Sequence, residues 1–215
     1  STQIREHVLC LNDKYILDLL SDKIYMRYWL GNYVPVLPSL IQDAHNLSFK
    51  VLEEKLQYSK AYVAQKNRSS GGFGTFYITR DNNILSYIHE TCNELLIVSP
   101  YIENNLSINV TALISEKQFT YFPASLQIVE EDDNRLIYHG ADFISIRNLS
   151  FELHSKINNY SEIILTRLKS LGYRGIIGID FIIKGNDVYF LELNPRYQAS
   201  SFLIDAALTS QGYCD

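Results

Sequence analysis

The chain has 215 residues, of which 47% are hydrophobic and 20% are charged, and its formal net charge is −5. A chain of this length and hydrophobicity can bury a sizeable core, which excludes a disordered protein. The negative charge argues against binding to nucleic acid or to acidic membranes through a broad basic surface, and no apolar run in the sequence is long enough to cross a bilayer. Three cysteines, Cys10, Cys92 and Cys214, are far apart and without CxxC spacing, so we expect a protein of the reducing cytoplasm.

The first part of the chain is predicted to be helical. Apolar residues recur at loose helical spacing through residues 2–30, and Ser21 or Asp22 could cap a second helix that ends at Gly31. Two prolines make VPVLPS (34–39) extended. We expect this segment to connect two helices.

A small α+β unit is predicted next. A helix at about 46–57 precedes AYVAQK (61–66) and GTFYIT (74–79), whose composition is typical of paired strands. A turn at 81–83 follows them.

Antiparallel strands are predicted in the middle of the chain. ELLIVSPYI (94–102) is an apolar strand interrupted at Pro100. The segments 106–115 and 119–131 alternate between apolar and polar residues, which indicates strands with one face toward water. These segments predict a sheet.

A long helix and a hairpin are predicted near the end. Between residues 150 and 171 apolar side chains recur every three or four residues, and Gly172 stands where a left-handed cap is favoured. GIIGIDFII (175–183) and VYFLEL (188–193) then flank the turn residues 185–187, which is typical of a β-hairpin.

Two carboxylates are expected to face each other on this hairpin. A three-residue loop pairs residue 184 with residue 188 and places Asp180 opposite Glu192. At about 5 Å and an effective dielectric near 20 their repulsion would be roughly 3 kcal/mol, which a shared cation would relieve. Asn194 adds an amide oxygen on the same face, and Mg²⁺ prefers oxygen ligands of this kind. The sequence therefore predicts a metal site of Asp180, Glu192 and Asn194 for Mg²⁺, with Mn²⁺ as an alternative.

A simpler interpretation of the hairpin stays open. Charged residues often end an apolar hairpin, and Asn-Pro is a common turn. A register shift of one residue would also move Glu192 to the other face. Asp180, however, lies in a run that is otherwise apolar or glycine, where an unpaired carboxylate is costly.

The segment QKNRSSGGFGT (65–75) is a candidate anion-binding loop. Glycines let backbone N–H groups approach a phosphate closely, and consecutive amides form an anion-binding nest. No GK[ST] or GxGxxG pattern is present, which excludes a Walker loop and a dinucleotide fingerprint. A flexible hairpin loop is the alternative.

The sequence resembles the ATP-grasp superfamily over residues 21 to about 205. The segments that carry this resemblance are, in chain order, LSDKIYMRYWL with VPVLPS, QKNRSSGGFGT, IVSPYIENNLSINVTALI, GYRGIIGIDFII and VYFLELNPRYQASS. GIDF followed by ELNPR is the most specific part of this resemblance. It implies an α+β fold in which two subdomains with antiparallel sheets clasp a nucleotide, and we expect these at 21–98, with the glycine-rich lid loop, and 99–215, with the metal site. Residues 1–20 would then be the remnant or linker of a Rossmann-like N-terminal domain that is missing here, or supplied by a partner chain.

The resemblance also implies roles for individual residues. Lys23 and Lys66 would contact ATP phosphates, the metal site would hold one or two magnesium ions, and Arg196 would steady the acyl phosphate, since a guanidinium matches an oxyanion. Arg196 and Lys66 are therefore the predicted catalytic residues. The predicted nucleotide-binding residues are Lys23, Lys66, Ser70, Gly71, Gly72, Gly74, Tyr101, Ile102 and Glu103.

The sequence departs from the family pattern at two places. Ser99-Pro100 stands where a glutamate often lies next to the adenine-binding backbone, and Glu103 or Asn105 would have to replace the acid that meets the ribose. Ser200 stands where biotin carboxylases carry a glutamate, which disfavours a bicarbonate-using carboxylase. Gln198 and Ser200 could line the acceptor site instead.

The resulting hypothesis is an ATP- and Mg²⁺-dependent ligase that activates a carboxylate as an acyl phosphate for attack by an amine, such as an amino acid or peptide. A non-catalytic nucleotide-binding or regulatory module, or a fragment of a larger ligase, is the second hypothesis. A metal-dependent hydrolase built on the acidic hairpin is the third.

Overall fold

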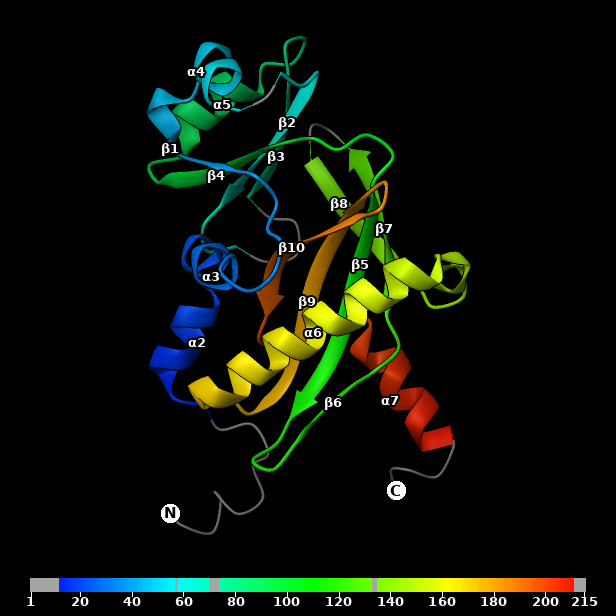
Figure 1. The fold of residues 1–215 in the computed structure, drawn as a ribbon. Helices are drawn as coiled ribbons and strands as arrows, with labels where there is room; N and C mark the ends of the chain where they lie inside the picture. Colours follow the sequence, from blue (N-terminus) through cyan, green and yellow to red (C-terminus); the bar gives the residue numbers. More distant parts are fainter. Residues whose placement is uncertain (1–11, 57, 70–73, 133–134, 211–215) are drawn as a thin grey trace.

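The structure is a computed structural model that describes residues 12–56, 58–69, 74–132 and 135–210. Within this part, the paired strands form two antiparallel sheets, one of four strands and one of six. Figure 1 shows the smaller sheet, with its helices, stacked at one end of the larger sheet. This arrangement confirms the predicted α+β class with two antiparallel sheets.

The smaller sheet has the strand order β1 (Leu40–Asp43), β4 (Leu95–Pro100), β2 (Ala61–Lys66) and β3 (Thr75–Thr79). The short 3-10 helix Ala44–Asn46, α4 (Phe49–Lys55) and α5 (Ile84–Thr91) accompany it. Leu52 of α4 and Ile88 of α5 share a buried core with Tyr62 and Ile78 of the strands. The pairing of β2 with β3 is as predicted.

Two features of this unit differ from the sequence prediction. The extended segment 34–39 runs beside β10, where Val36 forms a parallel bridge with Phe190. It then leads into the strand β1 and not into a helix. The prediction that it connects two helices was therefore wrong. Helix α5 was not predicted.

The larger sheet has the order β10 (Asp187–Asn194), β9 (Gly175–Lys184), β5 (Leu106–Ile114), β7 (Ser125–Asp132) and β8 (Arg135–Asp142), and β6 (Phe119–Tyr121) also pairs with β5. The strand predicted at 119–131 is thus two strands. Pro123 lies between them, and proline cannot donate to a ladder.

The remaining helices are α2 (Lys14–Leu20), α3 (Lys23–Leu30), the 3-10 helix Ser145–Asn148, α6 (Phe151–Leu171) and α7 (Ser201–Ser210). The hydroxyl of Ser150 caps α6 by accepting from the N–H of Leu153, and Gly172 ends it with a φ of 95°. Asp22 caps α3 by accepting from the N–H of Tyr25. Both capping predictions are confirmed.

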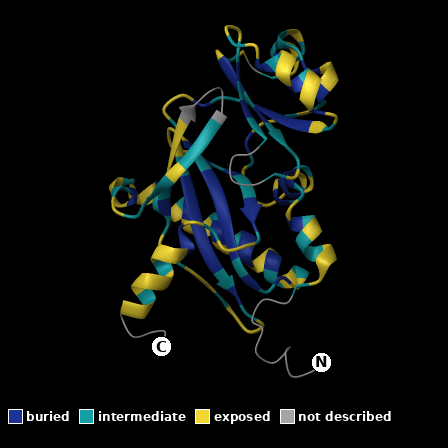
Figure 2. Ribbon diagram, turned by 180° about the vertical axis from the view of Figure 1, so that it is seen from behind, coloured by how far each residue is buried: buried dark blue, intermediate teal, exposed yellow. Residues whose placement is uncertain are grey.

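The pleat of β9 separates the core from the site. Ile177, Ile179, Phe181 and Ile183 are buried in one cluster with the apolar side chains of α6. Side chains of opposite parity, such as Asp180, therefore lie on the other face of the sheet. Figure 2 shows the central strands of the sheet as its most buried part.

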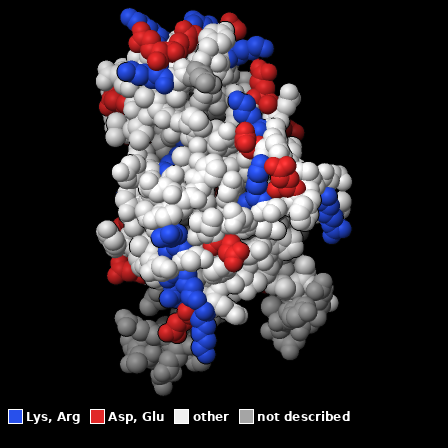
Figure 3. All heavy atoms as spheres, in the orientation of Figure 1, with Lys and Arg blue, Asp and Glu red and all other residues white. Residues whose placement is uncertain are grey.

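On the face shown in Figure 3, basic and acidic side chains are interspersed, without a broad area of either sign. None of the helices in the described residues is long and apolar enough to cross a membrane.

Candidate functional site

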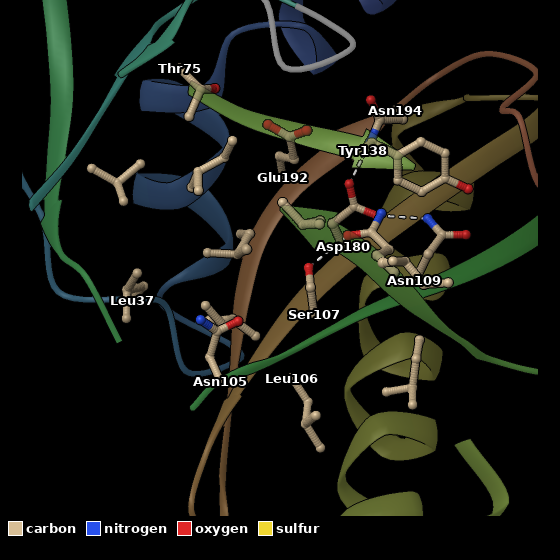
Figure 4. A pocket seen from close by; sticks show the side chains of 18 of the residues that line it. Leu37, Thr75, Asn105, Leu106, Ser107, Asn109, Tyr138, Asp180, Glu192 and Asn194 are labelled. Atoms are coloured by element: carbon tan, nitrogen blue, oxygen red, sulfur yellow. Dashed lines mark hydrogen bonds between the residues drawn. The ribbon is translucent and has the colours of Figure 1, made fainter. Parts of the chain in front are cut away.

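A cleft of about 850 Å³ lies between the two sheets. Its walls include Val63, Gln65 and Thr75 of the smaller sheet. The opposite wall is the polar face of the larger sheet, where Figure 4 shows Asp180, Asn109, Glu192 and Asn194 close together, with Leu37 and Leu106 farther along the cleft. The cleft therefore has a charged, polar part and a more apolar part.

The acidic hairpin is built differently from the prediction, but it reaches the predicted result. The loop has two residues, since Asp187 pairs with Lys184, and on that register Asp180 would lie opposite Leu191. A β-bulge between Phe190 and Glu192 adds one residue to β10, so that Glu192 pairs with Asp180. The predicted three-residue loop was wrong, and the predicted opposition of the two carboxylates is confirmed.

Asp180 is surrounded by three carboxamides. Its side chain is 7% exposed. Its Oδ1 accepts from Asn109 Nδ2 at 2.6 Å and Gln127 Nε2 at 3.2 Å, and its Oδ2 accepts from Asn194 Nδ2 at 2.8 Å. These dipoles replace part of the hydration that the buried carboxylate has lost.

The three amides do not fully compensate the burial. Burial raises the pKa of Asp180 to about 7, the charge of Glu192 acts in the same direction, and the hydrogen bonds from Asn109, Asn194 and Gln127 oppose the shift. Asp180 is therefore close to its protonation midpoint near neutral pH, mainly because burial disfavours its charged form, and the negative charge of Glu192 adds to the shift.

We expect the pH dependence of stability to report this shift. The folded state holds the proton of Asp180 up to about pH 7, whereas the unfolded state releases it near the ordinary value of 3.8. Between these values the folded state binds more protons, so stability should fall as the pH rises, by up to about 1.4 kcal/mol per pH unit. Chemical unfolding of the metal-free protein from pH 4 to 8 measures the effect.

Asp180→Asn should remove that pH-dependent loss, whereas Asp187→Asn, which changes an exposed carboxylate of the same hairpin, should keep it. The same slope in the wild type and in Asp180→Asn would contradict the assignment.

Lys23 joins Glu192 to the smaller subdomain. It is the first residue of α3 and is 7% exposed. Its Nζ lies 3.5 Å from Glu192 Oε2, and it donates to the carbonyl of Ser69 at 2.5 Å. Lys23 is thus the predicted phosphate-binding residue that the structure places beside the acidic pair.

Asn194 and Arg196 also line the cleft. Asn194 is 9% exposed and donates to Asp180, while its Oδ1 accepts from Arg196 Nη2 at 3.3 Å. Arg196 is exposed and also donates to the carbonyl of Tyr197. The structure therefore brings together Lys23, Asp180, Glu192, Asn194 and Arg196.

The oxygen atoms of this group suit a hard divalent cation. Asp180 and Glu192 would supply two carboxylates whose mutual repulsion a cation would relieve. Asn194 would supply its amide oxygen, for which a cation would compete with Arg196. Within the described residues, no group of three or more His, Cys, Asp or Glu side chains has a metal-binding arrangement. The metal site of Asp180, Glu192 and Asn194 stays a prediction.

Lys66 and Glu103 are not among the residues that line the cleft. Lys66 Nζ lies 3.1 Å from Glu94 Oε1, because strand alternation directs Gln65 rather than Lys66 into the cleft. Glu103 pairs at 3.6 Å with Lys60, and both side chains are exposed. The structure thus does not bring these two residues together with the acidic pair, and their contact with a nucleotide stays a prediction.

The glycine-rich loop is described only in part. Ser70, Gly71 and Gly72 lie outside the described residues. Gly74 has a φ of 78°, and a Cβ there would lie 2.8 Å from Lys66 Cδ. Glycine is therefore required at this position for backbone reasons.

Tyr101 and Ile102, which were predicted to bind the nucleotide, line the cleft, but some of their backbone groups are already bonded. The N–H of Tyr101 donates to the carbonyl of Ala61 at 2.9 Å. The carbonyl of Ile102 accepts from Asn105 Nδ2 at 2.6 Å. Any base bound here would use the other backbone groups of this segment.

Several cleft residues were not predicted from the sequence. Arg27 is 5% exposed and lies one helical turn after Lys23, a spacing that could have suggested a shared face. The alternating Ser107, Asn109 and Thr111 were interpreted as a face toward water. In the structure Asn109 is 3% exposed and lines the cleft, and Thr111 is 1% exposed, donating to Asn109 Oδ1 and accepting from Gln198 Nε2.

Comparison with known proteins agrees with this architecture. The carbamoyl phosphate synthase large chain of Thermoanaerobacter pseudethanolicus is 28% identical over 163 residues, which cover 73% of this chain and 14% of that protein. Among solved structures, an ADP complex of N5-carboxyaminoimidazole ribonucleotide synthetase superposes with a TM-score of 0.68 at 17% identity, covering 86% of this chain and 47% of that one.

The D-alanyl-alanine synthetase A of Vibrio cholerae has a TM-score of 0.66 at 15% identity, with 93% of this chain and 67% of that chain covered. The present chain therefore spans only a small part of the synthase and about half of the first structure. The family model of the ATP-grasp domain matches residues 20–200. With the fold and the match over most of its length, the chain belongs to the ATP-grasp family.

Proposed function

We propose that the chain carries the catalytic site of an ATP- and Mg²⁺-dependent carboxylate-amine ligase of the cytoplasm. The observation that carries the proposal is the opposition of Asp180 and Glu192 in a cleft between two sheets, with Lys23 bridging Glu192 to Ser69 of the smaller subdomain. Such a group can hold the triphosphate of ATP between a cation and a lysine.

The apolar part of the cleft suits the nucleobase. Leu37, Val63 and Ile102 from the smaller subdomain and its connections face Leu106 and Ile182 of the larger sheet. A purine ring between such side chains would place its phosphates toward Lys23 and the acidic pair. Nucleotide binding in this orientation is part of the proposal.

In the proposed reaction, a substrate carboxylate oxygen attacks the γ-phosphorus, and the bond to the β-phosphate oxygen breaks to release ADP. The amine then attacks the acyl carbon, the C–O bond to phosphate breaks, and the amine loses a proton as the C–N bond forms. The magnesium ion would neutralise charge on the transferring phosphoryl group. Lys23 would orient the phosphates, and Arg196 would stabilise the oxyanion of the tetrahedral intermediate.

The test is ADP release measured with ATP, Mg²⁺ and a panel of carboxylates and amines. We expect release that depends on both a carboxylate and an amine, together with thermal stabilisation by ATP that requires Mg²⁺. We also propose that the substrates are an amino acid or peptide carboxylate and an amine, and that a further domain or a partner chain takes part in binding them.

A second candidate is a nucleotide-binding module without catalysis. It is favoured by the placement of Lys66 and Glu103 away from the cleft. Stabilisation by ATP and Mg²⁺ without ADP release under any substrate combination would support this candidate. Metal-dependent hydrolysis that needs no ATP would contradict both.

A further inference from the structure

Arg27 is a buried guanidinium in the wall of the cleft. It lies on α3, which packs against β10 beside the smaller sheet in Figure 1. Lys23 and Arg27 are four residues apart, so both extend from one face of the helix toward Glu192. Lys23 pairs with Glu192 directly, and the charge of Glu192 acts on Arg27 through the same region.

The hydrogen bonds of Arg27 join two distant parts of the chain. Its Nε donates to the carbonyl of Leu191 at 2.9 Å, and its Nη2 donates to Gln65 Oε1 at 2.8 Å. Leu191 is the extra residue of the β-bulge, and Gln65 lies on β2 in the smaller sheet. One planar group thus contacts the acidic strand and the opposite wall of the cleft.

The bulge is what places Glu192 opposite Asp180. Without the extra residue, the register of the hairpin would set Leu191 against Asp180. A bulged residue lies outside the regular ladder, so its carbonyl needs a partner from elsewhere. Arg27 supplies that partner.

The guanidinium of Arg27 is buried at an energetic cost. Its Nη1 has no hydrogen-bond partner among the described residues, and burial lowers the pKa of the group to about 10, so it stays charged at neutral pH. Its other two nitrogens bond the carbonyl of Leu191 and the side-chain oxygen of Gln65, and removing one partner of a buried charged contact leaves the remaining groups unsatisfied. Arg27 is therefore tied to the strand that carries the acidic pair.

We propose that Arg27 is a positioning residue that holds the β-bulge at Leu191, and thereby Glu192, in register with Asp180, and that ties this strand to the smaller subdomain through Gln65. The expected effect of Arg27 on metal and nucleotide binding rests on the proposed function. The arrangement of the bulge itself can be tested separately.

The first experiment is titration of Mn²⁺, with and without adenosine 5′-(β,γ-imido)triphosphate, into the wild type, Arg27→Met and Arg27→Lys. Free Mn²⁺ is followed by electron paramagnetic resonance. We expect the apparent Mn²⁺ Kd to rise about 10- to 100-fold in Arg27→Met, as for other residues that orient metal ligands. Arg27→Lys keeps the charge but cannot bond Leu191 and Gln65 with one planar fork, so it should restore less than half of the lost affinity on a logarithmic scale.

A matched control is Arg80→Met, which removes an exposed arginine that pairs with Glu53 away from the cleft. We expect Arg80→Met to leave the Mn²⁺ Kd within twofold of the wild type. We also expect Arg27→Met to unfold thermally at a lower temperature than the wild type when metal is absent, because the carbonyl of Leu191 and the side chain of Gln65 lose their partner, so all variants are titrated well below that temperature. A Kd unchanged in Arg27→Met, or full recovery in Arg27→Lys, would overturn the proposal.

The second experiment needs no ligand. The N–H of Glu192 shares a peptide plane with the carbonyl that Arg27 holds. In ¹H–¹⁵N spectra of the metal-free protein, the Glu192 amide should shift and exchange faster with solvent in both Arg27 variants, and not in Arg80→Met.

These readouts separate the two proposals. A wild type that binds neither Mn²⁺ nor the nucleotide would contradict the proposed function, while the Glu192 amide would still decide the role of Arg27. An unchanged Glu192 amide in Arg27→Lys and Arg27→Met would overturn that role whatever the protein binds.

Discussion

ADP release is expected to fall about 100- to 1000-fold when Glu192 is replaced by glutamine. Glutamine keeps the size of the side chain but removes the charge that, with Asp180, would hold the cation at the triphosphate. A metal ion contributes several kcal/mol to charge stabilisation in such reactions, and about 1.4 kcal/mol corresponds to tenfold in rate. The measurement is the initial rate of ADP release at saturating ATP, together with thermal stabilisation by ATP as a function of Mg²⁺.

The same substitution removes a like charge from beside Asp180 but also removes the partner of the buried Lys23, so the thermal unfolding of the metal-free variant is measured alongside. Rates compared below its unfolding temperature separate a loss of metal binding from unfolding. Glu152→Gln is the matched control, because Glu152 is exposed on α6, forms an ion pair with Lys156 and does not line the cleft. Turnover and Mg²⁺ dependence that survive Glu192→Gln would contradict the ligase mechanism.

Nucleotide affinity is expected to fall about 10- to 100-fold when Lys23 is replaced by methionine. Lys23 is the buried cation that the structure places between Ser69 and Glu192, where it would face the phosphates. A hydrogen bond to a charged group contributes about 1.5–3 kcal/mol, which corresponds to this range. Calorimetric titration with a non-hydrolysable ATP analogue and Mg²⁺ measures the change.

Lys156→Met serves as the control for this substitution, since Lys156 forms an ion pair with Glu152 on α6 and is not among the residues that line the cleft. We expect it to bind the analogue like the wild type. If Lys23→Met binds the analogue with unchanged affinity, the triphosphate does not lie where we propose.

The elements of the fold followed largely from local sequence patterns. The helix of residues 151–171 has apolar periodicity, a serine cap and a terminal glycine, and these signals need no tertiary context. The strand interrupted by Pro123 and the helix at 84–91 were less predictable. Proline breaks a ladder only where a neighbouring strand demands the N–H, and a short helix depends on the core against which it packs.

The residue types of the site were also visible in the sequence. Asp180, Glu192, Asn194 and Arg196 stand out as polar groups at the end of an apolar hairpin, and Lys23 follows a helix cap. Their chemistry was sufficient to predict a cation and an anion at one place.

Tertiary structure decided which of these groups meet, and by what route. The opposition of Asp180 and Glu192 depends on a bulge, and a bulge is set by long-range contacts such as the bond from Arg27 to the carbonyl of Leu191. Lys66 had the predicted residue type, but it lies on the face of its strand opposite the cleft, paired with Glu94. The face on which a strand residue lies, and whether its charge is buried, depend on packing between segments that are far apart in the chain. A local sequence pattern therefore indicates which residues are candidates for the site. The tertiary structure decides which of these candidates lie together.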